Sequence, residues 1–320
     1  MCYSAQVWSD YRKYVREFRA TLGIKDFLKI FFQRQQGSKL MIPRGIENAF
    51  ADPQTDEERE IWDMVLEHRG LQSAKFEEEL FTQRARLVEA ERKLLKKETK
   101  GALDSQRIAT SKIERARAKL SEMHRTEHHP SDARIFPKSY VPVMVMEEGE
   151  LVVKPMRYQC RPARAPAFYD EKFPGTFNAR RDSLRDFWRG EFGRTHGLVV
   201  AQSFYEWVPT HQAESREMRP DEQPSTTEII FTPQTGQDML IACVFSHWQR
   251  DGEEDLLSFA FITDDPPPEV LRAGHDRCVV PLRPENVISW LTPEGRNLDA
   301  LDQMLEDRER PYYEHERLAA

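Results

Sequence analysis

The stretch GLVVAQSFYEW (197–207) is typical of a β-strand, because it is rich in Val, Phe and Tyr and carries a single charge. Similar stretches lie on both sides of it, from about residue 131 onward: YVPVMVME (140–147), ELVVKPM (150–156), TEIIFTP (227–233), DMLIACVFSHW (238–248) and SFAFITDD (258–265). Few helical patterns separate these stretches. We therefore expect an α+β protein with a central mixed or antiparallel β-barrel flanked by helices, rather than alternating strands and helices.

Helical patterns dominate the first 130 residues. Residues 6–36 carry apolar and aromatic side chains at helical spacing and predict two short helices around Leu22-Gly23. Residues 54–127 contain no proline, alternate in charge and predict two long helices turning at Lys100-Gly101, with Thr55 as the first cap. We expect residues 46–130 to form a helical insertion, possibly a hairpin. It would interrupt one catalytic domain made of residues 1–45 and 131–300, and residues 301–320 would form a C-terminal helix or tail.

Composition narrows the class of protein. No apolar run is long enough to span a membrane, and the N-terminus lacks the pattern of a signal peptide. The four cysteines (Cys2, Cys160, Cys243 and Cys278) are far apart and form no CxxC motif, which is typical of a chain from the reducing cytoplasm. No glycine-rich nucleotide motif is present. We therefore expect a cytoplasmic protein with no cofactor.

Two local patterns bear on ligands. Between residues 157 and 194 there are nine Lys or Arg against five Asp or Glu, although the chain has a net charge of -7. This excess suits a polyanion, but a solvated surface with mixed charges explains it as well. His124, His128 and His129 have metal-like spacing, yet Pro130 follows at once and no thiol is near, so we expect no metal.

Four short elements together carry a family resemblance. In chain order they are Met1-Cys2, Asn178-Ala179-Arg180, Phe204-Tyr205-Glu206-Trp207 and His275-Asp276-Arg277. In this set and order the chain resembles the SOS response-associated peptidase (SRAP) family, also called abasic-site-processing proteins. It departs from the family where Tyr3-Ser4 replaces the usual Gly-Arg, and where Tyr158 replaces a tryptophan.

The resemblance implies that Cys2, once Met1 is removed, reacts with the aldehyde of an abasic site in single-stranded DNA. The α-amine has a pKa well below that of lysine, so a useful fraction is a neutral nucleophile near pH 7. The neighbouring thiol can then close a five-membered thiazolidine ring. The implied enzyme is an autoprocessing cysteine peptidase that crosslinks abasic DNA, with lyase-like activity where ring closure is slow.

The resemblance also suggests roles for other residues. Glu206 is the candidate acid and base, His275 is a second proton carrier, and Asn178 orients the amine or the sugar. Contacts to DNA are expected from Arg180 as the main phosphate anchor, from Arg181 and Arg157, and from the rings of Tyr158 and Trp207. Packing in the core explains Trp207 equally well.

Two other functions remain open. Cys2 with its own amine would also suit an N-terminal-nucleophile amidohydrolase, for which Asn178 and His275 are equally apt. Alternatively, the helical insertion is a partner-binding arm and the domain carries no activity. We also expect any protein partner to bind through this insertion.

Overall fold

The computed structural model describes residues 3–293 and 297–318 of the chain. Two compact units divide it: Met1–Asp52 together with His129–Ala320, and Pro53–His128. The first unit contains the strands β1 (Ser4–Val7), β2 (Thr21–Leu22), β3 (Arg134–Ile135), β4 (Tyr140–Glu147), β5 (Glu150–Tyr158), β6 (Asn178–Arg180), β7 (His196–Pro209), β8 (Thr226–Pro233), β9 (Met239–Trp248), β10 (Leu256–Asp264), β11 (Cys278–Val279) and β12 (Tyr313–Arg317). Its helices are α1 (Tyr11–Phe18), α2 (Ile24–Gln35), α3 (Arg44–Asn48), α6 (Tyr169–Lys172), α7 (Thr210–Ala213), α8 (Pro268–Arg272), α9 (Val287–Leu291) and α10 (Leu298–Glu306).

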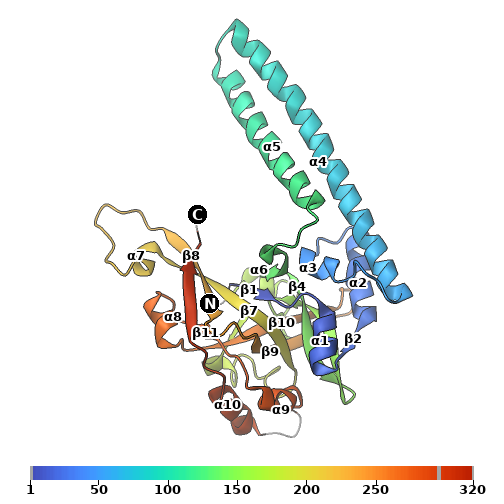
Figure 1. Cartoon of the computed structure of the whole chain (residues 1–320), viewed down its shortest axis with the longest axis vertical. Coiled ribbons are helices and arrows are strands. Elements are labelled where there is room, and N and C mark those ends of the chain that lie inside the picture. The colour runs from blue at the N-terminus through green and yellow to red at the C-terminus, as the bar shows by residue number, and fades with distance from the viewer. Residues whose placement is uncertain (1–2, 294–296, 319–320) are drawn as a thin grey trace. The chain divides into compact units, whose positions relative to one another are not determined.

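The twelve strands form one mixed sheet organised around β7, the longest strand (Figure 1). β7 pairs in antiparallel fashion with β1, β4, β8 and β9. β4 continues to β5, β5 pairs in parallel with β10, and β10 pairs with β9, so the pairing returns to β7. The α+β class and the mixed sheet expected from the sequence are confirmed.

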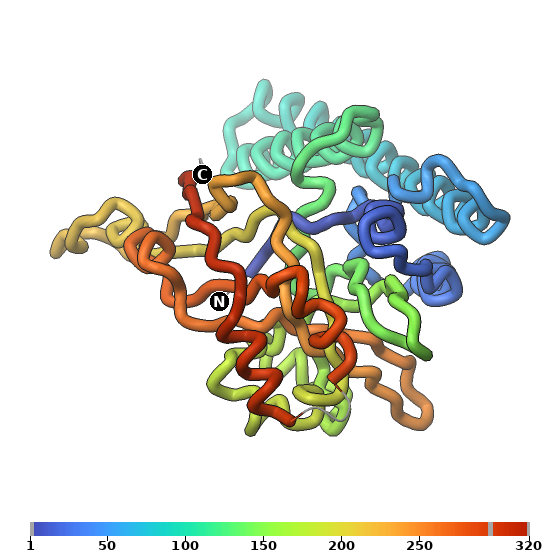
Figure 2. Tube along the Cα trace, turned by 60° about the horizontal axis from the view of Figure 1, so that its bottom comes forward, coloured from blue at the N-terminus to red at the C-terminus, as the bar shows by residue number. Residues whose placement is uncertain are grey.

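The core of the first unit lies against β7 and its neighbours. Phe204 stacks on Phe231 of β8, with ring centroids 5.0 Å apart, and both rings are fully buried. Tyr313 closes this cluster from the C-terminal strand β12, which runs beside β8 (Figure 2). Burial of several such rings supplies the main driving force that holds the strands in register.

The second unit is a pair of antiparallel helices, α4 (Asp56–Lys96) and α5 (Lys100–His124), which run side by side in Figure 1. Thr55 caps α4 as expected, because its side chain accepts the backbone N–H of Glu58. The expected turn at Lys100-Gly101 is wrong. The Thr99 side chain accepts the N–H of Ala102, and this cap starts α5 at Lys100 and leaves residues 97–99 as the turn.

Within residues 3–293 and 297–318, none of the helices has the length and hydropathy that a membrane span requires.

Candidate active site

The first described residue lies beside a predicted catalytic carboxylate. β1 pairs with β7 so that Ser4 lies opposite Tyr205, and the backbone N–H of Tyr3 donates to the carboxylate of Glu206. The Tyr3 ring packs edge-on against Phe136 and Phe177, at centroid distances of 6.0 and 5.9 Å. Tyr3 and β1 thus lie against the Phe-Tyr-Glu-Trp element. Cys2, the predicted nucleophile, lies outside the described residues.

Glu206 and His275 form a buried pair. The distance from Glu206 Oε2 to His275 Nε2 is 3.2 Å, and Glu206 is 1 % exposed. His275 Nδ1 lies 2.9 Å from the carbonyl oxygen of Arg277. An Nδ1–H donor to that carbonyl leaves Nε2 as the acceptor facing Glu206.

Burial sets the protonation of this pair. It raises the pKa of Glu206 well above its ordinary value and lowers the pKa of His275 to about 4, since each charged form loses its hydration. Burial thus favours the neutral form of each group, and Glu206 Oε2 faces His275 Nε2 at 3.2 Å. A carboxyl group that faces an imidazole in this way is an arrangement suited to acid–base chemistry.

A glycine at the end of α8 positions His275. Gly274 has φ +99, its N–H donates to the carbonyl of Leu271, and the N–H of His275 donates to that of Val270. These two bonds make a Schellman motif, which requires a left-handed residue where Gly274 stands. In AGHDR the glycine therefore ends the helix, and the histidine that follows it is placed at the site.

Asn178 and Arg180 share strand β6 but differ in environment. β6 pairs in parallel with β10, with Asn178 opposite Phe261, and Asn178 is buried. The Arg180 side chain is half-exposed and pairs with Asp182 at 2.5 Å. Exposed ion pairs of this kind are weak, so the Arg180 guanidinium can exchange Asp182 for a phosphate.

Two predicted DNA contacts, Tyr158 and Arg157, are engaged within the fold, Tyr158 in the core and Arg157 in an ion pair. Tyr158 is 0 % exposed and stacks on Phe259 at 5.3 Å, so its ring has no face left for a base. Arg157 pairs with the buried Asp170 at 2.6 Å, as does Arg161. Burial alone would raise the pKa of Asp170, but the Arg161 hydrogen bond and the Arg157 charge lower it.

Arg181 also has a structural partnership. It lies 3.0 Å from Asp264 of β10 and 2.5 Å from Glu306 of α10. These contacts use its charge to join two elements, and its phosphate contact stays a prediction. Trp207 is 49 % exposed, so the alternative that it packs in the core is wrong and its ring is accessible to a base.

Sequence reasoning missed Arg134, which lies next to the first residues of the chain. Its guanidinium is 3.8 Å from the centroid of the Tyr205 ring and donates to Ser4 Oγ at 2.9 and 3.1 Å. It also pairs with Glu228. The sequence signal is weak, because Arg134 lies far from every motif residue along the chain.

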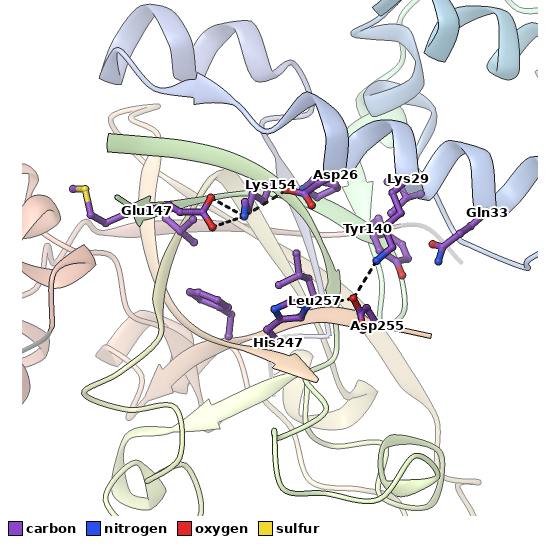
Figure 3. Close-up of a pocket in the computed structure, with 14 residues that line it drawn as sticks. Asp26, Lys29, Gln33, Tyr140, Glu147, Lys154, His247, Asp255 and Leu257 are labelled. Carbon is purple, nitrogen blue, oxygen red and sulfur yellow. Dashed lines mark hydrogen bonds and ion pairs between the residues drawn. The ribbon is translucent and has the colours of Figure 1, made fainter. Parts of the chain in front are cut away.

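A separate pocket of about 270 Å³ lies between α2 and the strands β4, β5, β9 and β10 (Figure 3). Lys154 there lies 2.7 Å from Glu147 and 3.5 Å from Asp26, and Lys29 lies 3.4 Å from Asp255. Its charges satisfy one another, so it presents no evident reactive group. In the part of the chain that the structure describes, no three His, Cys, Asp or Glu side chains cluster as metal ligands would.

Comparison with known proteins gives one family. No curated protein matches the chain significantly. Similar solved structures include a Bordetella bronchiseptica protein (17 % identity, 59 % of this chain and 88 % of that one, TM-score 0.46) and a Bacteroides thetaiotaomicron protein (14 %, 58 % and 78 %, 0.45). A phage-related protein from Bordetella bronchiseptica is similar too (16 %, 64 % and 89 %, 0.44). The model of the SOS response associated peptidase (SRAP) family matches residues 102–318, more than half of the sequence, and the chain therefore belongs to this family.

Proposed function

We propose that this protein captures abasic sites in single-stranded DNA through Cys2, after Met1 has been removed. The observation that carries the proposal is the buried Glu206–His275 pair, whose carboxyl group accepts the backbone N–H of Tyr3. Tyr3 is the residue covalently joined to Cys2, and consecutive Cα atoms are about 3.8 Å apart. Membership of the family independently supports a role associated with the SOS response.

The proposed reaction is a condensation. The neutral amine of Cys2 adds to the aldehyde carbon of the ring-opened sugar and gives a carbinolamine. Loss of water forms the imine, and addition of the thiol sulfur to the imine carbon closes the ring while the thiol proton ends on nitrogen. Aldehyde and aminothiol thus give thiazolidine and one water, with no oxidant or metal required.

Each neighbouring residue has a proposed part in this reaction. Glu206 in its protonated form donates a proton to the departing hydroxyl of the carbinolamine and takes back the proton that the nitrogen loses, while His275 Nε2 faces the Glu206 carboxyl group and assists this proton exchange. Asn178 orients the amine or the sugar oxygen. Arg180 binds a phosphate next to the lesion, and the exposed Trp207 ring stacks on a base. Removal of Met1 is the peptidase step and consumes one water.

The test is incubation with a single-stranded oligonucleotide from which one uracil has been excised, followed by a denaturing gel and intact-mass analysis. We expect an adduct with the mass of protein lacking Met1 plus DNA minus one water. Cys2→Ala should abolish it. Cys2→Ala and Cys2→Ser both keep the α-amine once Met1 is removed, so each should crosslink only when borohydride reduces the imine. Glu206→Gln should slow adduct formation by about a hundredfold or more.

The amidohydrolase alternative gives the opposite pattern. An enzyme of that class turns over amide substrates and leaves no denaturant-stable DNA adduct, and its activity is lost in both Cys2→Ala and Glu206→Gln. An intact Met1 on the purified protein, with no adduct, would instead favour a domain that has lost its chemistry.

A further inference from the structure

Helix α4 carries a first row of heptad-spaced residues that faces α5. This inner row alternates steps of four and three: Phe76, Leu80, Gln83, Leu87, Ala90 and Leu94. Gln83 and Ala90 are buried. On one side of the row, Arg86 donates to Ser105 at 2.9 Å and Glu79 lies 3.1 Å from Lys112 of α5. The inner row is therefore the seam of the antiparallel helix pair.

A second row with the same spacing lies on another face of α4. This outer row comprises Leu71, Ala74, Glu78, Phe81, Ala85, Val88, Arg92 and Leu95, all of them exposed. Phe81 is 77 % exposed and Leu95 is 89 % exposed. All four exposed large apolar side chains between residues 71 and 95 (Leu71, Phe81, Val88 and Leu95) fall in this row. Single exposed apolar residues are ordinary, but a row that repeats every seven residues is the pattern of a second coiled-coil seam.

We propose that the outer row binds the outer row of a second copy of this chain, with the two α4 helices antiparallel. The pattern of side-chain sizes favours this pairing. One antiparallel register places Phe81 opposite Ala85 of the partner subunit, and two-fold symmetry places Ala85 opposite the partner's Phe81. The same register sets Leu71 opposite Leu95 of the partner subunit. Large side chains thus meet small ones at the centre and apolar ones at both ends.

The two charges in the outer row specify the direction. In a parallel pair Glu78 would face Glu78 of the partner subunit, and Arg92 would face the partner's Arg92, which places like charges inside the seam. The antiparallel pair instead offsets Glu78 from Arg92 of the partner subunit by four residues, which is about one helical turn, or about 6 Å along the helix axis. The charges of two outer rows therefore attract each other in the antiparallel orientation and repel each other in the parallel one.

The first test measures the mass of the full chain by sedimentation equilibrium over a hundredfold range of concentration. We expect reversible dimers. Phe81→Glu should raise the dissociation constant more than tenfold, because the change is made twice in a symmetric interface. The matched control is Leu103→Glu, an exposed leucine of α5 outside the outer row, which should leave it unchanged. A monomer at every concentration, or a dimer indifferent to Phe81→Glu, would overturn the proposal.

A charge exchange tests the orientation. Glu78→Arg and Arg92→Glu should each weaken the dimer, and the double exchange should restore it, because opposite charges would then face each other across the seam again. Circular dichroism checks that each variant keeps its helices, since Arg92 also pairs with Glu89 at 2.9 Å within α4. A double variant that dimerises no better than the single ones would exclude the antiparallel pairing. These outcomes do not depend on the DNA chemistry.

Discussion

Glu206 and His275 form a buried pair whose side chains face each other at 3.2 Å. Their ordinary pKa values are 4.5 and 6.5, and burial moves the first well upward and the second down to about 4. The lowered pKa of His275 gives stability that is present above pH 6.5 and lost as pH falls toward 4. The raised pKa of Glu206 gives stability that is present below pH 4.5 and lost as pH rises. Between these values the folded and unfolded pairs each bind one proton, so the two effects cancel.

Replacing one member of the Glu206–His275 pair should reveal the effect of the other on the pH dependence of stability, and the two effects should have opposite signs. In Glu206→Gln only His275 remains, so between about pH 5 and about pH 6 the unfolding free energy should rise with pH more steeply than in the parent, by up to about 1.4 kcal/mol per unit. In His275→Gln the slope should change by a similar amount in the other direction. Urea unfolding at several pH values measures both slopes. Equal slopes in all three proteins would mean that the pair is not neutral.

The residues of the site divide into those that sequence reasoning could place and those that it could not. Glu206 and His275 come together as the motifs suggested, although the two residues are far apart in the chain. The burial of Tyr158 and the ion pairs of Arg181 could not be predicted, because both depend on strands and helices distant in sequence. In the sequence, Tyr158 beside Arg157 suggests a ring that stacks on a base, yet Phe259 of β10 covers the ring of Tyr158.

Among the elements, the long apolar strands were predictable and the short ones were not. The Val, Ile and Phe content of β7 and β10 predicts them as strands. The sequence of β12 is YEHER (313–317), of which only Tyr313 is buried. β12 forms because its backbone pairs with β8, and pairing with a strand that is distant in the chain cannot be predicted from a single sequence. The Schellman motif that ends α8 was only partly predictable. Its glycine can be seen in the sequence AGHDR, but the role of that glycine in ending the helix cannot.

Gly274→Ala tests whether this motif supports the site. A side chain at φ +99 should cost about 1–2 kcal/mol, and the new Cβ would lie 3.1 Å from Gln212 Cβ. His275 would move with it, so adduct formation should slow more than the loss of folded protein explains. Chemical denaturation and single-turnover crosslinking measure the two effects.

Gly252→Ala is the matched control, because Gly252 has φ +80 and nothing within 4 Å of the added Cβ. It should show the backbone cost alone, with an unchanged crosslinking rate. Equal crosslinking by both alanine variants would show that the position of His275 does not depend on the glycine.

At the scale of the whole molecule, an acidic chain of net charge -7 is proposed to bind a polyanion. The excess of arginine between residues 157 and 194 does not resolve this conflict, because Arg157, Arg161 and Arg181 are each paired with carboxylates. Binding must then rest on few phosphate contacts and on stacking, which predicts a shallow dependence of affinity on salt. It also explains why a reaction that forms a covalent bond would suit a protein with weak electrostatic attraction for its target.

Arg180 and its neighbour Arg181 separate phosphate contact from structure. For a single strand carrying a tetrahydrofuran abasic analogue, which cannot react, Arg180→Ala should reduce the slope of log affinity against log salt by about 0.7, one phosphate contact. Arg181→Ala should leave that slope unchanged and lower the melting temperature, because it removes the contacts to Asp264 and Glu306 that link β10 to α10. Fluorescence anisotropy over a salt series and thermal unfolding measure both. A slope that falls for Arg181→Ala and not for Arg180→Ala would exchange their assignments, since only an arginine whose charge reaches the DNA releases counterions.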